Sequence, residues 1–366
     1  MPIKWQWLAS LVLIFQAWYI TEGLKAKLNT MPQFTIHTLD NITSKLPSRT
    51  HKNITILMYS QKHIDSFWGK GTAKRRAEIG NNCSSNCRYT LNPNNAFNAV
   101  LFHIGMHIGT RFFKTFWQEY NFTVLPLTGI FLSEADDDKA RAKSDKEAFD
   151  IRVSYSFEPD VFSGQSCQGL LNLQEMVRNR ASNTDWLKIQ FERRGTTVGA
   201  ISNCGSPFRN KYISNLMQHL QIEQLGRCFQ GQKKVATTRG SPVWQSKKID
   251  DFKNYRFALA MENKNKEDYI SEKIWDAYVA GTIPIYHGTT KVYDFVPPNS
   301  HLNVNDYEDT ENLAKTIEKI SKNYTLYKTF FQWDESDLLR TIKKYKCDRH
   351  WLCQLCDQFL QKQNAL

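Results

Sequence analysis

The sequence predicts an α/β protein in which parallel strands alternate with crossover helices. In the C-terminal half, the runs FALAM and TIPIY have the composition of buried strands, and a helical pattern lies between them. Strand, helix and strand in that order call for a parallel sheet. Another alternation comes before it, in which TVGAIS is followed by a helical segment and then by IEQLGRC. A chain of 366 residues also has room for two domains of ordinary size.

The composition is that of a globular protein with a basic surface. Hydrophobic residues make up 41% of the chain, charged residues 23%, and the formal net charge is +12. This charge admits nucleic acid, acidic membranes and phosphorylated small molecules as partners, and it does not choose among them. No G-x-G-x-x-G motif follows a strand and no P-loop motif occurs, so the sequence gives no support for NAD binding or for P-loop nucleotide hydrolysis.

An uncharged and largely apolar run extends from Trp5 to Ile20. We interpret residues 1–20 as a cytosolic tip and transmembrane signal anchor, and the polar residues 21–51 as a stem. A cleaved signal peptide is the alternative, but no clear small-x-small cleavage site follows Ile20. We therefore expect a membrane-anchored protein whose globular part is lumenal.

The glycosylation sequons and the cysteines suit the same location. Sequons of the form N-x-S/T occur at Asn41, Asn53, Asn82, Asn121 and Asn323. Five of the cysteines lie near the two ends of the folded part, at Cys83, Cys87, Cys347, Cys353 and Cys356. In an oxidising lumen they would form disulfides that tie the termini together, whereas in the cytosol some of them could hold zinc. The anchor and the sequons favour disulfides, without fixing their pairing.

The stretch ENKNKEDYISEKIWDAY, between the two predicted strands, is charged at its start and amphipathic afterwards. We expect a helix from about Tyr269 to Ala280, with Asp268 as its N-cap and Gly281 at its C-terminal stop. The preceding loop leaves the carboxyl end of a strand, where open α/β sheets bind ligands. Free N–H groups at the helix start together with Lys273 suit a diphosphate, and Glu272 suits sugar hydroxyls. Spacing alone also allows a solvated helix face here.

The segment FALAMENKNKEDYISEKIWDAYVAGTIPIYHG resembles the donor-binding signature of the α1,3-fucosyltransferases, glycosyltransferase family 10. Upstream, ISNCGSPFRNKYISNL is similar to the S-N-x(5)-R segment of that family, and the C-x-x-C of its C-terminus is present at Cys353 and Cys356. The likeness covers most of the C-terminal half and is weaker in the N-terminal half.

This resemblance implies the GT-B fold, in which two Rossmann-like domains face a cleft. On that basis we expect an acceptor-side domain at residues 52–185 and a GDP-fucose-binding domain at 186–335. A Cys-rich tail at 336–366 would pack back on the N-terminal domain.

The resemblance also implies roles for individual residues. Matched by position, Arg209 and Lys273 contact the diphosphate of GDP-fucose, and Asn263, Tyr269 and Glu272 hold the nucleotide and fucose. Two cations beside the leaving GDP would stabilise the negative charge that grows as the sugar–phosphate bond breaks.

The catalytic base of the family is a Glu that follows an apolar run in the N-terminal domain, and in GIFLSEADDD this position is Glu134. The family usually shows N-L-E-x-P, whereas this chain has Ser133 before Glu134 and lacks the proline. The alternative is that Glu134 is one more acid of an acidic loop.

No metal site is expected from the residues. A D-x-D occurs in Asp136, Asp137 and Asp138, but the loop is crowded with charges and we interpret it as solvated. We expect no required cofactor, and whether Mn²⁺ stimulates the reaction stays open.

The resemblance leads us to expect an inverting fucosyltransferase that moves L-fucose from GDP-fucose to a glycan hydroxyl, α1,3 to N-acetylglucosamine in an N-glycan core or an N-acetyllactosamine-type antenna. Two alternatives stay open: a protein O-fucosyltransferase of the same family that acts on Ser or Thr, and an inactive protein that only binds a nucleotide sugar. The expected partners are GDP-fucose, a glycan or glycoprotein acceptor and the membrane, with no nucleic acid. The expected location is the Golgi membrane, as a single-pass type II protein.

Overall fold

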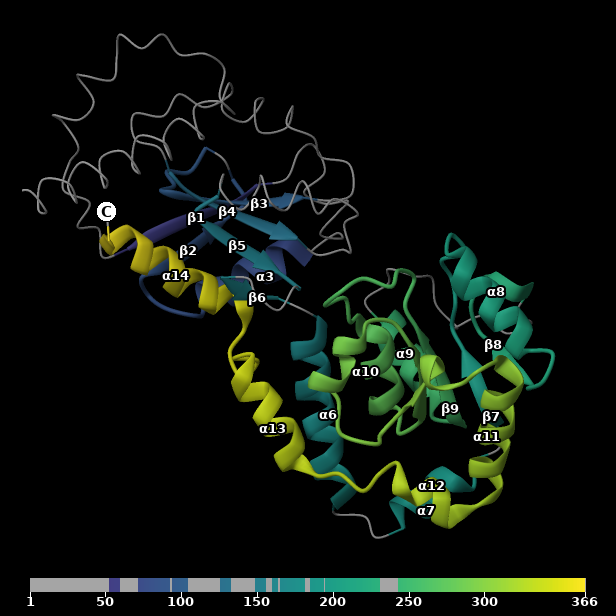
Figure 1. The fold of residues 1–366 in the computed structure, drawn as a ribbon. Helices are drawn as coiled ribbons and strands as arrows, with labels where there is room; N and C mark the ends of the chain where they lie inside the picture. The colour runs from purple at the N-terminus through teal and green to yellow at the C-terminus, as the bar shows by residue number, and fades with distance from the viewer. Residues whose placement is uncertain are drawn as a thin grey trace, which may run out of the picture. The chain divides into compact units, whose positions relative to one another are not determined.

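The computed structural model describes residues 53–59, 72–92, 94–104, 126–132, 149–155, 160–163, 165–181, 185–193, 195–230 and 243–365. The chain forms two compact units (Figure 1): unit 1 comprises Met1–Ser154 and Trp351–Leu366, and unit 2 comprises Tyr155–His350. The expected signal anchor (1–20) and stem (21–51) lie outside the described residues. Within the described residues, no helix has the length and apolar character needed to span a membrane.

Unit 1 is built on a parallel sheet. Its strands are β1 (Ile54–Tyr59), β2 (Cys87–Thr90), β3 (Ala99–Ile104), β4 (Leu127–Leu132) and β5 (Ile151–Ser154), and its described helices are α3 (Thr72–Asn81) and α14 (Trp351–Ala365). The strand order is β2-β1-β3-β4-β5, and each neighbouring pair is parallel. Ile56, Val100 and Ile130 are fully buried, as expected for central strands of a parallel sheet.

The C-terminal helix α14 packs against α3, β1 and β5 of unit 1. Its first residue, Trp351, stacks on Phe131 with 4.8 Å between ring centroids, and the Tyr89 hydroxyl donates a 2.6 Å hydrogen bond to the Leu352 carbonyl. We expected all of residues 336–366 to pack back on the N-terminal domain. In the structure only the part from Trp351 onwards belongs to unit 1, and residues 336–350 belong to unit 2.

Unit 2 is a second α/β layer structure. Its strands are β6 (Val161–Phe162), β7 (Gly195–Gly199), β8 (Ile222–Gln224), β9 (Tyr255–Met261), β10 (Ile283–His287) and β11 (Leu302–Asn303). Its α-helices are α6 (Gln165–Ala181), α7 (Trp186–Phe191), α8 (Pro207–Leu216), α9 (Trp244–Phe252), α10 (Glu272–Val279), α11 (Thr310–Lys322), α12 (Tyr324–Thr329) and α13 (Glu335–Lys344). Short 3-10 helices are η3 (Cys228–Gln230), η4 (Thr290–Asp294) and η5 (Val304–Asp306).

The main sheet of unit 2 has the strand order β11-β10-β9-β7-β8, and its pairs are parallel. Because β7 is the first of these strands in the chain, this is the 2-1-3-4-5 order of doubly wound folds. The direction of winding reverses between β7 and β9. Ligands of such sheets bind at the carboxyl ends of the strands at this switch point.

Helices cover both faces of this sheet, and the sequence of β9 shows why. Phe257 and Leu259 pack with apolar residues of α8 and α11, whereas Ala258 and Ala260 face α9 and α10. Side chains alternate between the two faces of a strand, so both faces of β9 are buried. The small alanines leave room for the helices on their side.

The boundary between the two units differs from the one expected at residues 185 and 186. Unit 2 begins at Tyr155, because α6 packs against α10 and α13. Gly169 of α6 allows this close approach, since a Cβ there would lie 2.1 Å from Cγ of Trp275 on α10. This packing of α6 on α10 is specified by residues about a hundred positions apart in the chain.

The helix α10 starts later than expected, at Glu272 instead of about Tyr269. Asp268 is not its N-cap, because the backbone of Asp268 is left-handed with φ of 68°, and Ser271 occupies the N-cap position. The predicted stop is confirmed: Gly281 has φ of 69°, its N–H binds the Tyr278 carbonyl, and the next N–H, of Thr282, binds the Ala277 carbonyl. This is the Schellman arrangement, in which glycine is favoured.

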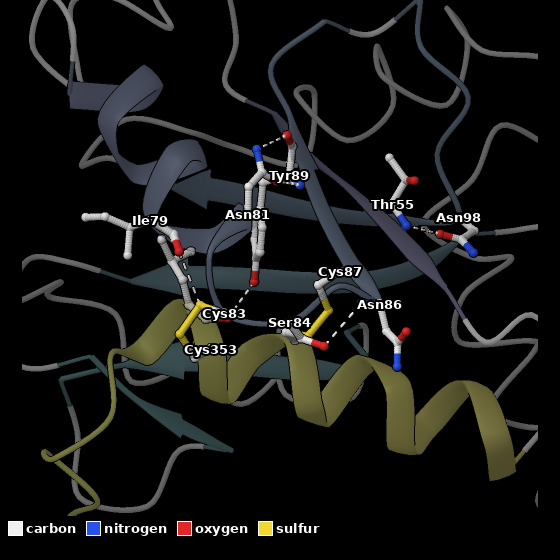
Figure 2. Close-up of a disulfide and its surroundings, with 12 residues drawn as sticks. Thr55, Ile79, Asn81, Cys83, Ser84, Asn86, Cys87, Tyr89, Asn98 and Cys353 are labelled. Atoms are coloured by element: carbon white, nitrogen blue, oxygen red, sulfur yellow. Dashed lines mark hydrogen bonds between the residues drawn. A yellow bond between two sulfur atoms is a disulfide. The ribbon is translucent and has the colours of Figure 1, made fainter.

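All eight cysteines of the chain are paired, which confirms the expectation of disulfides. The bonds are Cys83–Cys353, Cys87–Cys356, Cys167–Cys347 and Cys204–Cys228. The first fastens α14 to the segment between α3 and β2, and the second fastens it to Cys87, the first residue of β2 (Figure 2). We had grouped Cys347 with the cysteines that tie the termini, but it bonds to Cys167 of α6 inside unit 2.

Three of the five sequons lie in described residues, and their asparagines Asn53, Asn82 and Asn323 are exposed. Asn41 and Asn121 lie outside the described residues. An exposed asparagine is accessible to a modifying enzyme, so the three described sites are compatible with glycosylation.

We predict that the two disulfides of α14 are partly redundant. Taken alone, each of them closes a large loop, and the Cys167–Cys347 disulfide shortens that loop. Once one of the two is present, the other closes only a small ring, formed by residues 83–87 and 353–356. Replacing the pair Cys83 and Cys353 by serine, or the pair Cys87 and Cys356, should therefore cost little loop entropy. The variant that lacks both disulfides should lose about 2 kcal/mol more free energy of unfolding than the sum of the losses in the two variants that lack one disulfide each.

The measurement is urea denaturation of the purified chain, followed by circular dichroism. Removal of Cys204–Cys228, which lies in unit 2 and closes a separate loop, is the control. Its loss of free energy of unfolding should simply add to the loss from removing either α14 disulfide. Strictly additive losses for the two α14 disulfides would contradict the prediction.

Candidate functional site

Polar residues gather at the carboxyl ends of the central strands of unit 2. Glu262 follows β9 directly, and its N–H donates to the carbonyl of His287 at the end of β10. The segment that leaves β7 runs through Asn203 into α8, which carries Arg209. These segments flank the switch point between β7 and β9, where the fold places ligands.

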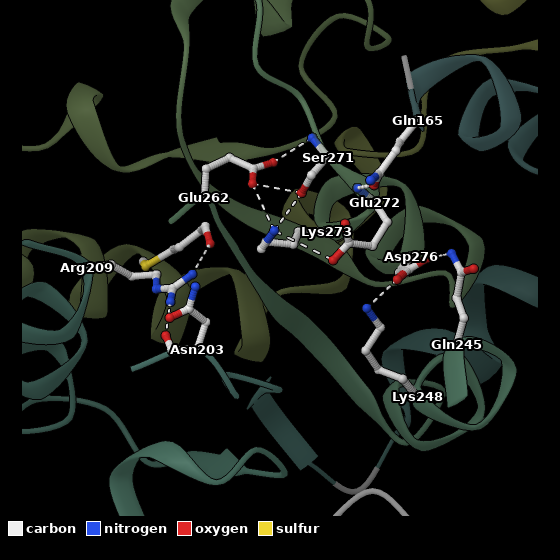
Figure 3. Close-up of polar contacts among 11 residues, drawn as sticks. Gln165, Asn203, Arg209, Gln245, Lys248, Glu262, Ser271, Glu272, Lys273 and Asp276 are labelled. Carbon is white, nitrogen blue, oxygen red and sulfur yellow. Dashed lines mark hydrogen bonds and ion pairs between the residues drawn. The ribbon is translucent and has the colours of Figure 1, made fainter. Parts of the chain in front are cut away.

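The side chain of Glu262 is completely buried, with 0% of its surface exposed. Its Oε1 accepts a 2.8 Å hydrogen bond from the N–H of Ser271, and its Oε2 accepts one of 2.7 Å from the Ser271 hydroxyl. Oε2 also lies 3.0 Å from Nζ of Lys273 (Figure 3). One carboxylate thus joins the end of β9 to the start of α10.

Lys273 is held on two sides. Besides Glu262, its Nζ donates to the Ser271 hydroxyl at 2.6 Å and lies 3.6 Å from Oε1 of Glu272. Burial tends to lower the pKa of Lys273, but the carboxylates of Glu262 and Glu272 outweigh it and raise the pKa above its usual value. The ammonium is therefore a permanent positive charge, and 21% of the side chain remains exposed to meet a ligand.

Glu272 is the first residue of α10, and 32% of its side chain is exposed. Burial tends to raise the pKa of this carboxyl, but the charges of Lys273 and then Lys248 outweigh it and lower the pKa to about 2. Glu272 is thus an ionised carboxylate with accessible oxygens. It can accept hydrogen bonds from hydroxyl groups, and it would repel a phosphate.

The first N–H groups of α10 are already engaged, contrary to our expectation of free donors there. The N–H of Ser271 binds Glu262, and the N–H of Glu272 donates a 2.7 Å hydrogen bond to Oε1 of Gln165 on α6. These two donors are not available to an anion in this arrangement. A diphosphate at this end of α10 would meet the ammonium of Lys273.

Arg209 is almost completely buried, with 2% of its surface exposed. Its Nη1 donates to the Met261 carbonyl at 3.3 Å, and its Nη2 donates to the Asn203 carbonyl, so the guanidinium braces the ends of β9 and of the β7 segment (Figure 3). Burial lowers its pKa, and the opposing charge of Glu262 limits that shift. Its Nε is buried and has no hydrogen-bond partner in the described part of the chain.

Three predicted site residues remain: Asn263, Tyr269 and Glu134. Asn263 is half-buried and directly follows Glu262. Tyr269 is buried ahead of α10, with its ring edge-on to Tyr155 at 5.4 Å, and so lies outside the helix that we expected to begin there. Glu134 lies outside the described residues, as does the acidic string after it. Within the described residues no group of three His, Cys, Asp or Glu side chains has the geometry of a metal site.

A second buried ion pair holds α10 against α9. Lys248 of α9 pairs with Asp276 of α10, and both side chains are nearly inaccessible. Gln245 donates to Asp276 at 2.8 Å, and the ammonium of Lys248 lies 4.6 Å from the ring centroid of Trp244. Asp276 lies one turn after Glu272, so this pair fixes the helix that presents Glu272 and Lys273.

Sequence reasoning missed Glu262 and Gln165. A signal for Glu262 existed, because a carboxylate that directly follows the apolar run FALAM is placed at the ligand-binding edge of a parallel sheet. No local signal points to Gln165, which is separated from Glu272 by 107 residues.

We predict that Glu262 and Lys273 are strongly coupled. Glu262→Gln should lower the free energy of unfolding by about 1–3 kcal/mol at pH 7, because it leaves a largely buried ammonium without its main counter-charge. The double variant with Lys273→Met should lose less than the sum of the two single losses. Since the pKa of Lys273 is raised in the folded state, the coupling should be present below pH 10.5 and decline as the pH rises through the folded pKa.

The measurement is a double-mutant cycle by urea denaturation at pH 7 and at pH values above 10. Glu267→Gln, an exposed carboxylate of the same loop, is the control and should change stability little. Additive losses in the cycle would mean that the two side chains do not act as a pair.

Comparisons with known proteins agree with this geometry. The sequence model described as glycosyltransferase family 10 (fucosyltransferase) C-term matches residues 191–365. The chain is similar to GDP-fucose protein O-fucosyltransferase 3 of Danio rerio, 31% identical over 150 residues, which covers 40% of this chain and 32% of that protein. It is also similar to a 4-galactosyl-N-acetylglucosaminide 3-alpha-L-fucosyltransferase of Homo sapiens, 27% identical over 201 residues, which covers 51% of this chain and 48% of that protein.

The matches thus span less than half of the length of these two curated relatives. Among solved structures, that of an alpha1,3-fucosyltransferase with GDP-fucose matches with a TM-score of 0.53 at 15% identity, and the match covers 89% of this chain and 97% of that one. At this identity the structural match shows the fold. The sequence matches show that residues 191–365 are similar to glycosyltransferase family 10, the fucosyltransferase family.

Proposed function

We propose that this protein is an inverting fucosyltransferase that transfers L-fucose from GDP-fucose to a hydroxyl group of an acceptor. The observation that carries the proposal is the cation Lys273, held by the buried Glu262 at the switch point of unit 2. The comparisons support the choice of donor, since residues 191–365 match the fucosyltransferase family model and a similar protein has GDP-fucose in its name.

In this proposal Lys273 binds the diphosphate of the donor, and Arg209 of α8 adds a second positive charge. As the bond between the sugar and the phosphate breaks, negative charge accumulates on GDP, and fixed cations stabilise it most when they need no rearrangement. Glu272 then accepts hydrogen bonds from hydroxyl groups of fucose, because its accessible carboxylate attracts hydroxyl donors and repels phosphate. Asn263 and Tyr269 complete the nucleotide-sugar site.

The transfer itself is a single in-line displacement. The acceptor oxygen attacks the anomeric carbon of the β-linked fucose, the carbon–oxygen bond to phosphate breaks, and GDP leaves with the bonding electrons. A carboxylate takes the proton of the acceptor hydroxyl, and the resemblance assigns this role to Glu134. The product is an α-fucoside, and the protein returns to its starting state once the proton is released.

For the acceptor we propose O3 of an N-acetylglucosamine in a glycan, as in the N-glycan core or an N-acetyllactosamine antenna. A second candidate, Ser or Thr of a protein, is favoured by the similarity to protein O-fucosyltransferase 3 of Danio rerio and of Xenopus laevis, which is 34% identical over 140 residues, 36% of this chain and 29% of that protein. The donor site is the same in both cases, so the acceptor-side unit must decide between them.

We further propose that the protein acts in the lumen of the Golgi, anchored by residues 1–20. The supporting observations are the four disulfides, which persist in oxidising compartments, and the exposed asparagines of three sequons. Secretory expression with and without a glycosidase, followed by the mass of the chain, tests this placement.

We predict that Lys273→Ala lowers the turnover of GDP-fucose about a hundredfold or more, because one fixed charge beside the leaving group is lost. The assay is the release of GDP by the purified chain in the presence of an acceptor, together with calorimetry for GDP binding. Lys253→Ala is the matched control, since Lys253 is exposed and precedes β9, at the opposite edge of the sheet.

Lys273→Ala leaves Glu262 buried without its partner, so both proteins are compared below their melting temperatures. Unchanged turnover and GDP affinity in a folded Lys273→Ala variant would show that the donor binds elsewhere.

The acceptor is decided by a panel in the same assay, consisting of N-glycans, N-acetyllactosamine and folded protein modules. Release of GDP with the glycans supports the first candidate, and release only with protein modules supports the second. Binding of GDP without turnover on any acceptor would favour an inactive nucleotide-sugar-binding protein.

We predict that Glu134→Gln lowers transfer by about 10²–10⁴-fold while the affinity for GDP stays the same, because only the acceptor of the proton is removed. Asp136→Asn is the control in the same acidic string and should leave transfer intact, with or without added Mn²⁺. Full activity of Glu134→Gln would assign the base to another residue and leave the donor site untouched.

A further inference from the structure

Phe208 is an exposed aromatic residue beside the cationic part of the site. It is the second residue of α8 and directly precedes Arg209, and 60% of its surface is accessible. Its ring stacks on His287 with 4.7 Å between centroids and 30° between planes. One turn further along α8, Tyr212 lies 6.3 Å from the Phe208 ring at 28°. Phe208 therefore contacts two rings of the protein while 60% of its surface stays accessible.

The position of this ring follows from the sheet order. Phe208 belongs to the helix that follows β7, whereas His287 ends β10, and β9 lies between these two strands. The ring must therefore reach across the carboxyl end of β9. Glu262 is located there, and the guanidinium of Arg209 binds the carbonyl of Met261 at the same place.

His287 gives the ring a rigid and uncharged support. It is 6% exposed, and its carbonyl accepts the N–H of Glu262 at 2.8 Å, so its backbone is fixed to the site. Burial, aided by the nearby charge of Arg209, lowers the pKa of His287, which keeps the imidazole neutral at physiological pH. Its Nδ1 is buried and has no hydrogen-bond partner among the described residues.

A phenyl ring offers no hydrogen bond, so it does not suit a phosphate or the hydroxyl groups of a hexose, although it can pack on the apolar C–H face of a sugar. It does suit a flat aromatic ring, because stacking of planar π-systems combines apolar burial with favourable quadrupole geometry. A nucleoside diphosphate has such a ring at the end opposite to its terminal phosphate. With the diphosphate beside Lys273 and Arg209, an aromatic platform next to Arg209 is placed for the base.

We propose that the exposed face of Phe208, supported by His287, is the stacking platform for the purine base of the nucleotide donor. The proposal rests on the proposed function, since it takes the site to bind a nucleoside diphosphate. Stacking does not depend on the hydrogen-bonding edge of the base, so Phe208 contributes affinity for the nucleoside and does not select guanine over adenine.

The test compares Phe208→Ala with Phe208→Trp by calorimetry on the purified chain, using three probes: GDP, inorganic pyrophosphate and fucose 1-phosphate. Phe208→Ala should weaken GDP binding roughly ten- to hundredfold, and Phe208→Trp, which keeps a flat aromatic face, should restore it to within about threefold. The affinities for pyrophosphate and for fucose 1-phosphate, which lack the base, should stay unchanged. Leu339→Ala, which truncates an exposed apolar side chain on α13, is the matched control.

Because Phe208 is exposed, its truncation should not unfold the chain, and circular dichroism verifies this. Equal GDP affinity in wild type and Phe208→Ala overturns the platform and leaves the proposed function standing. An equal loss for pyrophosphate also overturns it, because Phe208 would then act by placing Arg209, and a loss for fucose 1-phosphate would assign the ring to the sugar. Failure of the wild type to bind GDP at all overturns the proposed function, and the platform with it.

Discussion

The interaction on which the donor-side unit depends is the buried carboxylate of Glu262 bound to Ser271 and Lys273. A carboxylate without solvent contact is stable only when charges and donors surround it, and here the N-cap residue and the lysine of α10 provide both. The same contacts decide where α10 starts and where its lysine is held. Under the proposed function, an incoming anion would meet the exposed part of Lys273 and not the buried Glu262. The carboxylate would then fix the cation in advance without competing for the ligand, which would reduce the entropy lost on binding.

Other contacts make this arrangement stiff. The guanidinium of Arg209 joins the ends of two strands across the switch point, and Lys248 and Asp276 fix α10 from the opposite side. The charges of the cluster are balanced without a ligand, since Arg209 and Lys273 face Glu262 and Glu272. A diphosphate bound as proposed would therefore add negative charge to a nearly neutral cluster, and its binding would depend on where each charge lies more than on their sum.

The amino-acid sequence predicted the parts of this structure that depend on local patterns. The apolar runs FALAM and TIPIY located β9 and β10 closely, and Gly281 marked the end of α10, because a left-handed residue after a helix favours glycine. The start of α10 was misplaced, since Ser271 becomes the N-cap through its contact with Glu262 from the preceding strand. The location of α6 in unit 2 and the role of Gln165 depend on contacts between distant segments, which no local pattern contains. The family resemblance named Arg209, Glu272 and Lys273, but it did not reveal that Arg209 is buried on backbone carbonyls.

Unit 1 combines two segments that are far apart in the sequence, and this limits the order in which the two units can fold. Unit 2 is continuous in sequence, from Tyr155 to His350, and can fold as soon as that stretch has been synthesised. Unit 1 instead needs α14, which follows unit 2 in the sequence, and its two disulfides to that helix join cysteines 270 and 269 residues apart. Unit 1 therefore cannot complete its fold before unit 2 has been synthesised, although N-terminal domains usually fold first during translation. Until α14 has been synthesised, β1 and β5 lack the helix that packs on them.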